Sequence, residues 1–126
     1  MRKKNAPTLV DWAVIRTTPT EYPEHSRYHF TGVGLGHPRL SDGMQIITTE
    51  IQEIGASREW GRTKSRVYNL LRHVGRDEFT SEVASTVKDI LFQELRHTFD
   101  VEWVSIEDWL RTKSGEGSTA QEEDQT

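Results

Sequence analysis

The residues best suited to binding chemistry are cations and aromatic rings that gather in residues 58–76. This stretch holds six basic residues and one acidic residue, and two aromatic residues, Trp60 and Tyr68, lie among the cations. Cations attract phosphates and aromatic faces stack on bases, so this composition is typical of a nucleic-acid-binding surface. The predicted nucleic-acid-binding residues are Arg58, Trp60, Arg62, Lys64, Arg66 and Arg72.

Two observations favour another interpretation of this basic stretch. Arg62, Lys64 and Arg66 could form cross-strand ion pairs with Glu50 and Glu53, an arrangement common in β-sheets. The whole chain has a formal net charge of −4 and a pI of about 5.7, whereas nucleic-acid-binding modules are usually basic overall. Nucleic-acid binding is therefore the alternative hypothesis and not the first one.

The following stretch, residues 77–109, is acidic, with nine acidic and two basic residues. Such charge is often the solvated face of an amphipathic helix, but it can also dock on a basic protein, where carboxylates take the place of phosphates. The first hypothesis is therefore a non-enzymatic interaction module that binds a basic protein partner through this half of the chain and the acidic tail. The predicted partner-binding residues are Glu82, Asp89, Glu94, Asp100, Glu102, Trp103 and Trp109.

The two tryptophans of this predicted site have a second interpretation. Tryptophan is a frequent anchor of protein interfaces, and Trp103 and Trp109 lie six residues apart in an acidic stretch. Alternatively, both close the bottom of a small hydrophobic core, and we favour this interpretation.

Patterns typical of metal or catalytic sites are incomplete. His25 and His29 are four residues apart, and Glu24 and His37 could complete a metal site, but no helix presents the histidines as in a zinc-binding H-E-x-x-H helix. The glycines of 32–36 lack the Gly-Lys-Ser/Thr of a phosphate loop and are interpreted as bend glycines. The chain has no cysteine and no G-x-S-x-G elbow, so we expect neither a metal, a cofactor nor an enzymatic activity.

Short runs of β-branched and aromatic residues, separated by Gly, Pro and Asp clusters, predict strands from Leu9 to Leu71. We expect strands over 9–17, from residue 27, over 44–54 and over 65–71, and a fifth if 59–63 pairs. So few apolar residues predict a small bent antiparallel sheet or partly open barrel.

The hydrophobic period then changes to that of a helix. Apolar residues recur at spacings of three and four from Phe79 to Leu95, which predicts one long amphipathic helix. A short strand over 99–103 should return to the sheet edge, and Ser105 with Asp108 resembles a capping box that begins a short helix over 106–113. The fold class is therefore α+β. A single domain over 9–113 has a β portion (9–71) and a mainly helical portion (77–113), between a flexible basic N-terminus (1–8) and a disordered acidic tail (114–126).

A pattern of turn and strand residues is spread over roughly residues 11–71. It consists of Gly36-His37-Pro38-Arg39, Asp42-Gly43, Thr48-Thr49 with Ile51, and Thr63, Ser65, Val67-Tyr68 and Leu70. This pattern resembles that of small hypothetical proteins of bacteria and of their phages or mobile elements. The resemblance implies no activity, and it suggests a phage or mobile-element origin.

The sequence also indicates where in the cell the protein is expected. No apolar stretch approaches the roughly 20 residues needed to cross a bilayer, and the basic start is not followed by the apolar segment of a secretory signal. We therefore expect a cytoplasmic protein without a membrane partner, and the sequence makes no prediction of its oligomeric state.

Overall fold

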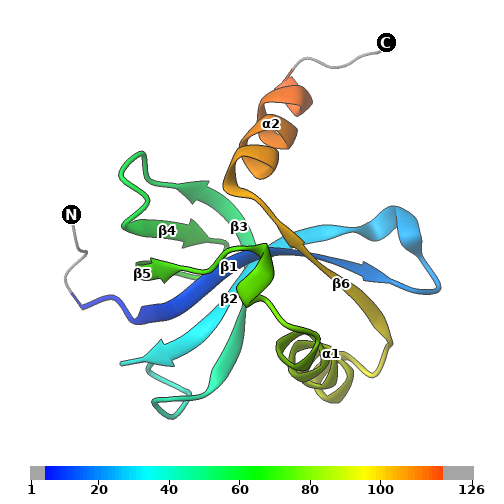
Figure 1. The fold of residues 1–126 in the computed structure, drawn as a ribbon, viewed down its shortest axis with the longest axis horizontal. Coiled ribbons are helices and arrows are strands. Elements are labelled where there is room, and N and C mark those ends of the chain that lie inside the picture. Colours follow the sequence, from blue (N-terminus) through cyan, green and yellow to red (C-terminus); the bar gives the residue numbers. More distant parts are fainter. Residues whose placement is uncertain (1–4, 118–126) are drawn as a thin grey trace.

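The computed structural model describes residues 5–117, which fold into six strands, two α-helices and two short 3-10 helices (Figure 1). The α+β class predicted from the sequence is confirmed. The elements in chain order are β1 (Thr8–Pro19), η1 (Pro23–His25), β2 (Arg27–Leu35), β3 (Gln45–Ile54), β4 (Trp60–Thr63), β5 (Val67–His73), η2 (Arg76–Glu78), α1 (Ser81–Leu95), β6 (Phe99–Val104) and α2 (Ile106–Gly117).

Strands β1 to β5 pair in a closed ring. Each strand is antiparallel to the next, and β5 pairs with β1 in parallel. An up-and-down barrel with an odd number of strands must close between two strands that run in the same direction, which explains the parallel pair. The sequence predicted a bent antiparallel sheet or a partly open barrel of four or five strands, whereas the sheet is mixed, has six strands and closes into a ring.

Strand β1 pairs with two different strands along one of its edges. Residues 8–12 pair with β5, and residues 14–19 pair with β6. The change of partner occurs at a β-bulge, where the register shifts between Val10 and Ala13 and Asp11 has a φ of 53°. Strand β6 thus extends the sheet beyond the barrel, as predicted for the returning strand.

The barrel interior forms the main hydrophobic core, and α2 packs at one end of it. The core residues are Leu9, Trp12, Val14, Phe30, Ile46, Ile51, Ile54, Tyr68, Leu70, Ile106 and Trp109. Two glycines of β2, predicted to be bend residues, face this interior: a Cβ on Gly32 would lie 3.1 Å from the Cα of Trp12, and one on Gly34 would lie 3.1 Å from Cδ1 of Ile46. Close packing over the strand is therefore the reason for both glycines.

A second, smaller core lies between the outer face of the sheet and α1 (Figure 1). Val87 and Leu91 of the helix pack with Ile15 of β1, and partly buried residues of β3 and β6 surround them. The hydroxyl of Thr80 accepts a hydrogen bond from the backbone N–H of Val83, which caps the helix, and Arg96 ends it with a φ of 60°. The predicted long amphipathic helix is confirmed, and no described helix is long and apolar enough to cross a membrane.

The predicted boundaries differ at both ends of the domain. Thr8 belongs to β1 and is buried, so the strand begins inside the segment predicted to be flexible. Helix α2 continues through Gly117, four residues beyond the predicted end, so residues 114–117 are helical and not part of a disordered tail. The remaining tail, 118–126, and residues 1–4 lie outside the described part of the chain.

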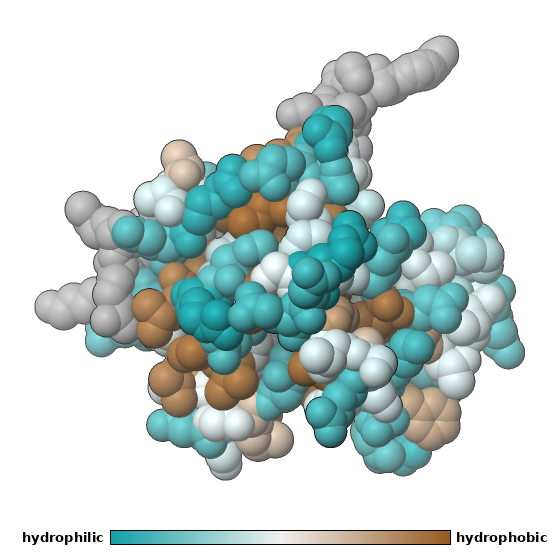
Figure 2. Space-filling view, viewed as in Figure 1, coloured by the Kyte–Doolittle hydropathy of each residue, from teal (hydrophilic) through white to brown (hydrophobic). Residues whose placement is uncertain are grey.

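Helix α1 leaves part of the outer barrel face uncovered. Val10 lies directly opposite Leu71 of β5 and Val33 of β2, and the Leu71 side chain is 55% exposed. Leu35 and Met44 are exposed nearby at the β2 and β3 ends. Figure 2 shows hydrophobic residues gathered at the lower left, where β1 and β2 lie in Figure 1.

Candidate nucleic-acid interface

Three residues of the predicted nucleic-acid-binding set meet in one cleft at the β4–β5 hairpin. Trp60 and Arg62 come from β4, and Arg66 precedes β5. The cleft has a volume of about 540 Å³ and is otherwise lined by Asn5, Ala6, Pro7 and Val67. We call it the Trp60 cleft.

The walls of the Trp60 cleft are held by the barrel. Trp60 packs against Gly55, where an added Cβ would lie 2.4 Å from the indole Nε1, so only glycine leaves room for this ring position. On the facing wall, the backbone N–H of Asn69 donates to the carbonyl of Pro7 over 2.8 Å, which fixes this segment to β5. Both walls are therefore positioned by backbone contacts.

The cross-strand ion pairs suggested as the other interpretation are confirmed for two residues. Arg62 lies 3.2 Å from the Glu53 carboxylate and also donates to Gln52, and Lys64 lies 3.3 Å from the Glu50 carboxylate. These pairs are solvent-exposed, and such pairs contribute only about 0–1 kcal/mol. A phosphate can therefore compete for either cation at small cost.

Arg66 differs from its two basic neighbours. Within the described chain it forms no ion pair with a carboxylate. Burial, together with the positive charges of Arg66 and Arg39, lowers the pKa of His37. The His37 ring lies 6.2 Å from that of Tyr68 on β5.

The other three members of the predicted set, Arg58, Lys64 and Arg72, are not part of the cleft lining. Arg58 pairs with Glu107 of α2 at 3.3 Å. Arg72 pairs with Asp11 at 2.6 Å and with Glu78 at 3.0 Å. Both cations link structural elements, and the structure does not bring them to the Trp60 cleft.

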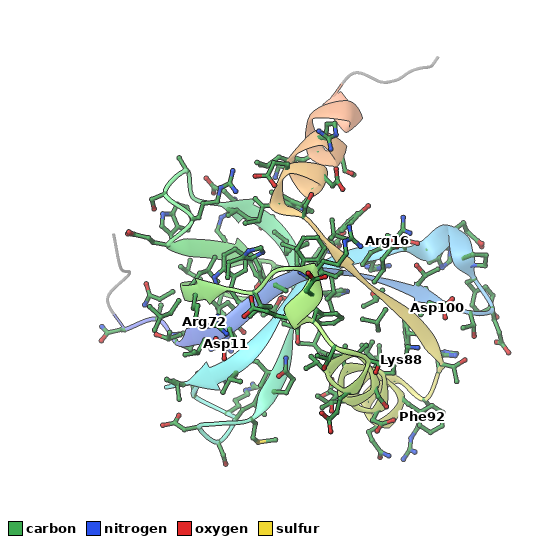
Figure 3. The ribbon with its side chains drawn as sticks, in the orientation of Figure 1. Asp11, Arg16, Arg72, Lys88, Phe92 and Asp100 are labelled. Atoms are coloured by element: carbon green, nitrogen blue, oxygen red, sulfur yellow. The ribbon has the colours of Figure 1, made fainter. Side chains whose placement is uncertain are left out.

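The predicted acidic site is divided between two faces. Glu82, Asp89 and Glu94 are exposed on α1, which packs against Phe99 and Val101 of β6. Successive strand residues point to opposite sides, so Asp100 and Glu102 face away from the helix. Figure 3 shows Asp100 on the other side of β6 from Lys88 and Phe92 of α1. Glu102 also pairs with Arg16.

The two tryptophans of the predicted acidic site are packed. Trp109 is 4% exposed and belongs to the barrel core, which confirms the structural interpretation for this residue. Trp103 is partly buried, its indole N–H donates to the carbonyl of Val74 over 3.0 Å, and the Arg76 guanidinium lies 4.8 Å from its ring centre. Neither indole projects from the surface as an interface anchor.

The histidine pair considered for a metal site has other contacts. His29 is held by Thr48 and Thr17 on adjacent strands, and His25 lies 3.8 Å from Glu24. Over residues 5–117, no three or more His, Asp or Glu side chains are arranged to hold a metal ion.

Sequence reasoning missed the second wall of the Trp60 cleft, residues 5–7. These residues carry no charge or motif, and Pro7 and Trp60 are 53 positions apart in the sequence, so no local pattern signals that they line one cleft. The chain matches no protein-family model, no curated protein and no solved structure.

Proposed function

We propose that the protein binds single-stranded nucleic acid in the Trp60 cleft. The observation that carries the proposal is the presence of an indole and two guanidinium groups, from Trp60, Arg62 and Arg66, in one cleft. Aromatic side chains stack on bases of any sequence, and guanidinium groups bind phosphates with two parallel hydrogen bonds. This is the alternative hypothesis from the sequence, and the geometry supports it better than the divided acidic site.

The form of the cleft favours unpaired bases over a duplex. A side chain at the wall of a cleft can stack only on a base that has left the double helix, because paired bases are covered by their neighbours. Gly55 and the barrel hold the Trp60 indole in place, so little of its side-chain entropy is lost on binding. Three further cations, Arg2, Lys3 and Lys4, directly precede Asn5 of the cleft wall in the sequence.

The acidic net charge predicts moderate affinity with a clear salt dependence. Each phosphate contact to a single strand contributes a slope of about −0.7 to the logarithm of affinity against the logarithm of salt concentration. Contacts from Arg62 and Arg66 alone would give a slope of roughly −1.4, to which any further cation adds.

The test is fluorescence anisotropy with labelled single-stranded DNA, single-stranded RNA and duplex DNA at about 50 and 200 mM salt. Arg66→Gln should weaken single-strand binding and reduce the salt slope by about 0.7. Trp60→Leu should weaken binding about tenfold or more, the effect of losing one stacked base. Arg111→Gln, an exposed arginine of α2 with the same charge change, is the matched control.

Three results would overturn the proposal. The first is the absence of saturable binding to any of the three probes at the lower salt concentration. The second is equal weakening by Arg66→Gln and Arg111→Gln, which would reflect net charge and not the Trp60 cleft. Stronger binding to the duplex than to the single strands would contradict the stacking model.

The basic-protein hypothesis stays a second candidate because of one observation on α1. Glu82, Asp89 and Glu94 are exposed, and none of them forms an ion pair with another described residue. The test is a triple Glu82→Gln, Asp89→Asn, Glu94→Gln variant in a partner pull-down. A partner retained at wild-type level by this variant would remove the α1 face from consideration.

A further inference from the structure

The second core ends in a space that the chain does not fill. Leu95 lies one turn after Leu91 on the same face of α1, yet Leu95 is 52% exposed and Leu91 only 6%. Beyond Leu91 the helix is separated from β1 and β2 by a pocket of about 380 Å³. We call it the Leu95 pocket.

The lining of the Leu95 pocket combines apolar walls with polar side chains, one of which is the Arg27 cation. The apolar residues are Pro19, Tyr22, Leu91, Leu95 and Phe99, and the polar ones are Thr17, His25, Arg27, His29 and His97. No carboxylate belongs to this lining. The pocket is therefore complementary to a molecule with an apolar body and a negative group.

Hydrogen bonds determine which ring nitrogen of His29 carries a proton. Nδ1 of His29 lies 2.8 Å from the carbonyl oxygen of Thr48, which can only accept, so Nδ1 carries the proton. Nε2 then accepts from the Thr17 hydroxyl at 3.1 Å. Both ring nitrogens are thus used, and burial lowers the pKa of His29. His29 is a neutral wall of the pocket, and Arg27 is its permanent cation.

The carboxylate near Arg27 holds this cation only loosely. Arg27 lies 3.8 Å from Glu50, and the same Glu50 oxygen lies closer, at 3.3 Å, to Lys64. His25 lies 3.8 Å from Glu24. A hydrogen-bonded charge pair is shorter, about 2.7–2.9 Å, so Arg27 can take a second carboxylate without losing a strong bond.

Hydrogen bonds join two segments that contribute residues to the pocket lining. The backbone N–H of Thr20 donates to the carbonyl of Thr98 over 3.1 Å, and the two hydroxyls lie 2.6 Å apart. These contacts join the β1–β2 hairpin to the α1–β6 connection, both at the right of Figure 1. The Tyr22 ring stacks on that of His25 at 5.9 Å, which places an aromatic pair at the mouth.

We propose that the Leu95 pocket binds a small monocarboxylate with an apolar body, such as a medium-chain fatty acid. The apolar chain would continue the second core between Leu91, Leu95 and Phe99, and the carboxylate would bind the Arg27 guanidinium. The volume lies near the lower end of the range for small-molecule sites, which excludes large ligands. Arg27 is the one permanent cation of the lining, which matches a ligand with one negative charge.

The experiment is a calorimetric titration of the full chain with octanoate, octanol and octylammonium, which share a chain length and differ in charge. Octanoate should bind saturably and at least tenfold more tightly than octanol, and octylammonium should bind more weakly than either. Arg27→Gln should reduce octanoate affinity to that of octanol. Glu50→Gln should increase the affinity for octanoate, because this substitution removes the carboxylate that competes for Arg27.

A filling substitution separates this pocket from the Trp60 cleft. Leu95→Trp should abolish octanoate binding and leave nucleic-acid binding unchanged, because Leu95 is half exposed and lies outside the cleft lining. Arg111→Gln again serves as the charge control. Equal affinities for octanoate and octanol, octanoate binding unaffected by Arg27→Gln, or no saturation below about 5 mM would each overturn the proposal.

Discussion

Arg72 and Asp11 face each other at the seam of the barrel, where Nε of Arg72 donates to Oδ1 of Asp11 over 2.6 Å (Figure 3). Both residues have positive φ, 58° and 53°. They lie between the paired positions Val10–Leu71 and Trp12–His73 of the parallel strands. A non-glycine residue in this conformation costs of order 1–3 kcal/mol, so two irregular residues and their ion pair mark the point where β1 changes partner.

Glu78, the second carboxylate on Arg72, should contribute to the acid sensitivity of the protein. The backbone N–H of Gly75 and the Arg72 guanidinium hydrogen-bond to Glu78 and lower its pKa below the ordinary 4.5. Its stabilisation is therefore complete above pH 4.5 and is lost as the pH falls through the lowered pKa. In urea unfolding at pH 6 and pH 3, wild type should lose more stability than Glu78→Gln; identical losses would contradict the prediction.

His29 should make stability depend on pH in a higher window. Burial lowers its pKa from 6.5, so the folded protein binds the proton more weakly than the unfolded chain. Its stabilisation is present above pH 6.5 and is lost as the pH falls through the folded-state value. His29→Gln should cost about 0.5–3 kcal/mol at pH 7.5 through its hydrogen bonds. The variant should also change less than wild type between pH 7.5 and 5; an unchanged pH profile would show that other groups dominate.

Gly61 should be intolerant of any side chain. An added Cβ would lie 2.4 Å from Cζ of Phe30, which is fully buried in the barrel. Gly61→Ala should destabilise the fold by about 1–3 kcal/mol, the usual cost of overpacking a core. Gly75→Ala is the control, because nothing lies within 4 Å of its added Cβ, and thermal unfolding of the two variants gives the comparison. Equal melting temperatures would refute the packing argument.

Trp109 should contribute to the stability of the fold. Because the indole is buried with Ile106 at the end of the barrel, Trp109→Ala should cost about 3–5 kcal/mol in chemical unfolding. The neighbouring Leu110 is 38% exposed, and Leu110→Ala should cost much less. A Trp109→Ala variant with the stability of Leu110→Ala would mean that α2 does not close the core.

Local patterns predicted the elements well. The period of Val83, Val87 and Leu91 identified α1, because these residues share the helix face that packs on the sheet. The same sequence reasoning anticipated the ion pairs of Arg62 and Lys64 with neighbouring carboxylates. It placed the C-terminal end of α2 four residues early, because helical backbone continues into a stretch without apolar residues.

The sequence by itself determined the α+β class, the long helix, the returning strand and the charge of each segment, since all depend on residues close together in the chain. Only the tertiary structure decided where those charges lie. Closure of β5 on β1 joined Pro7 to the Trp60 wall, and alternation along β6 turned Asp100 away from α1. Strand pairing acts between residues far apart in the sequence, and a one-residue change of register reverses the face of every side chain.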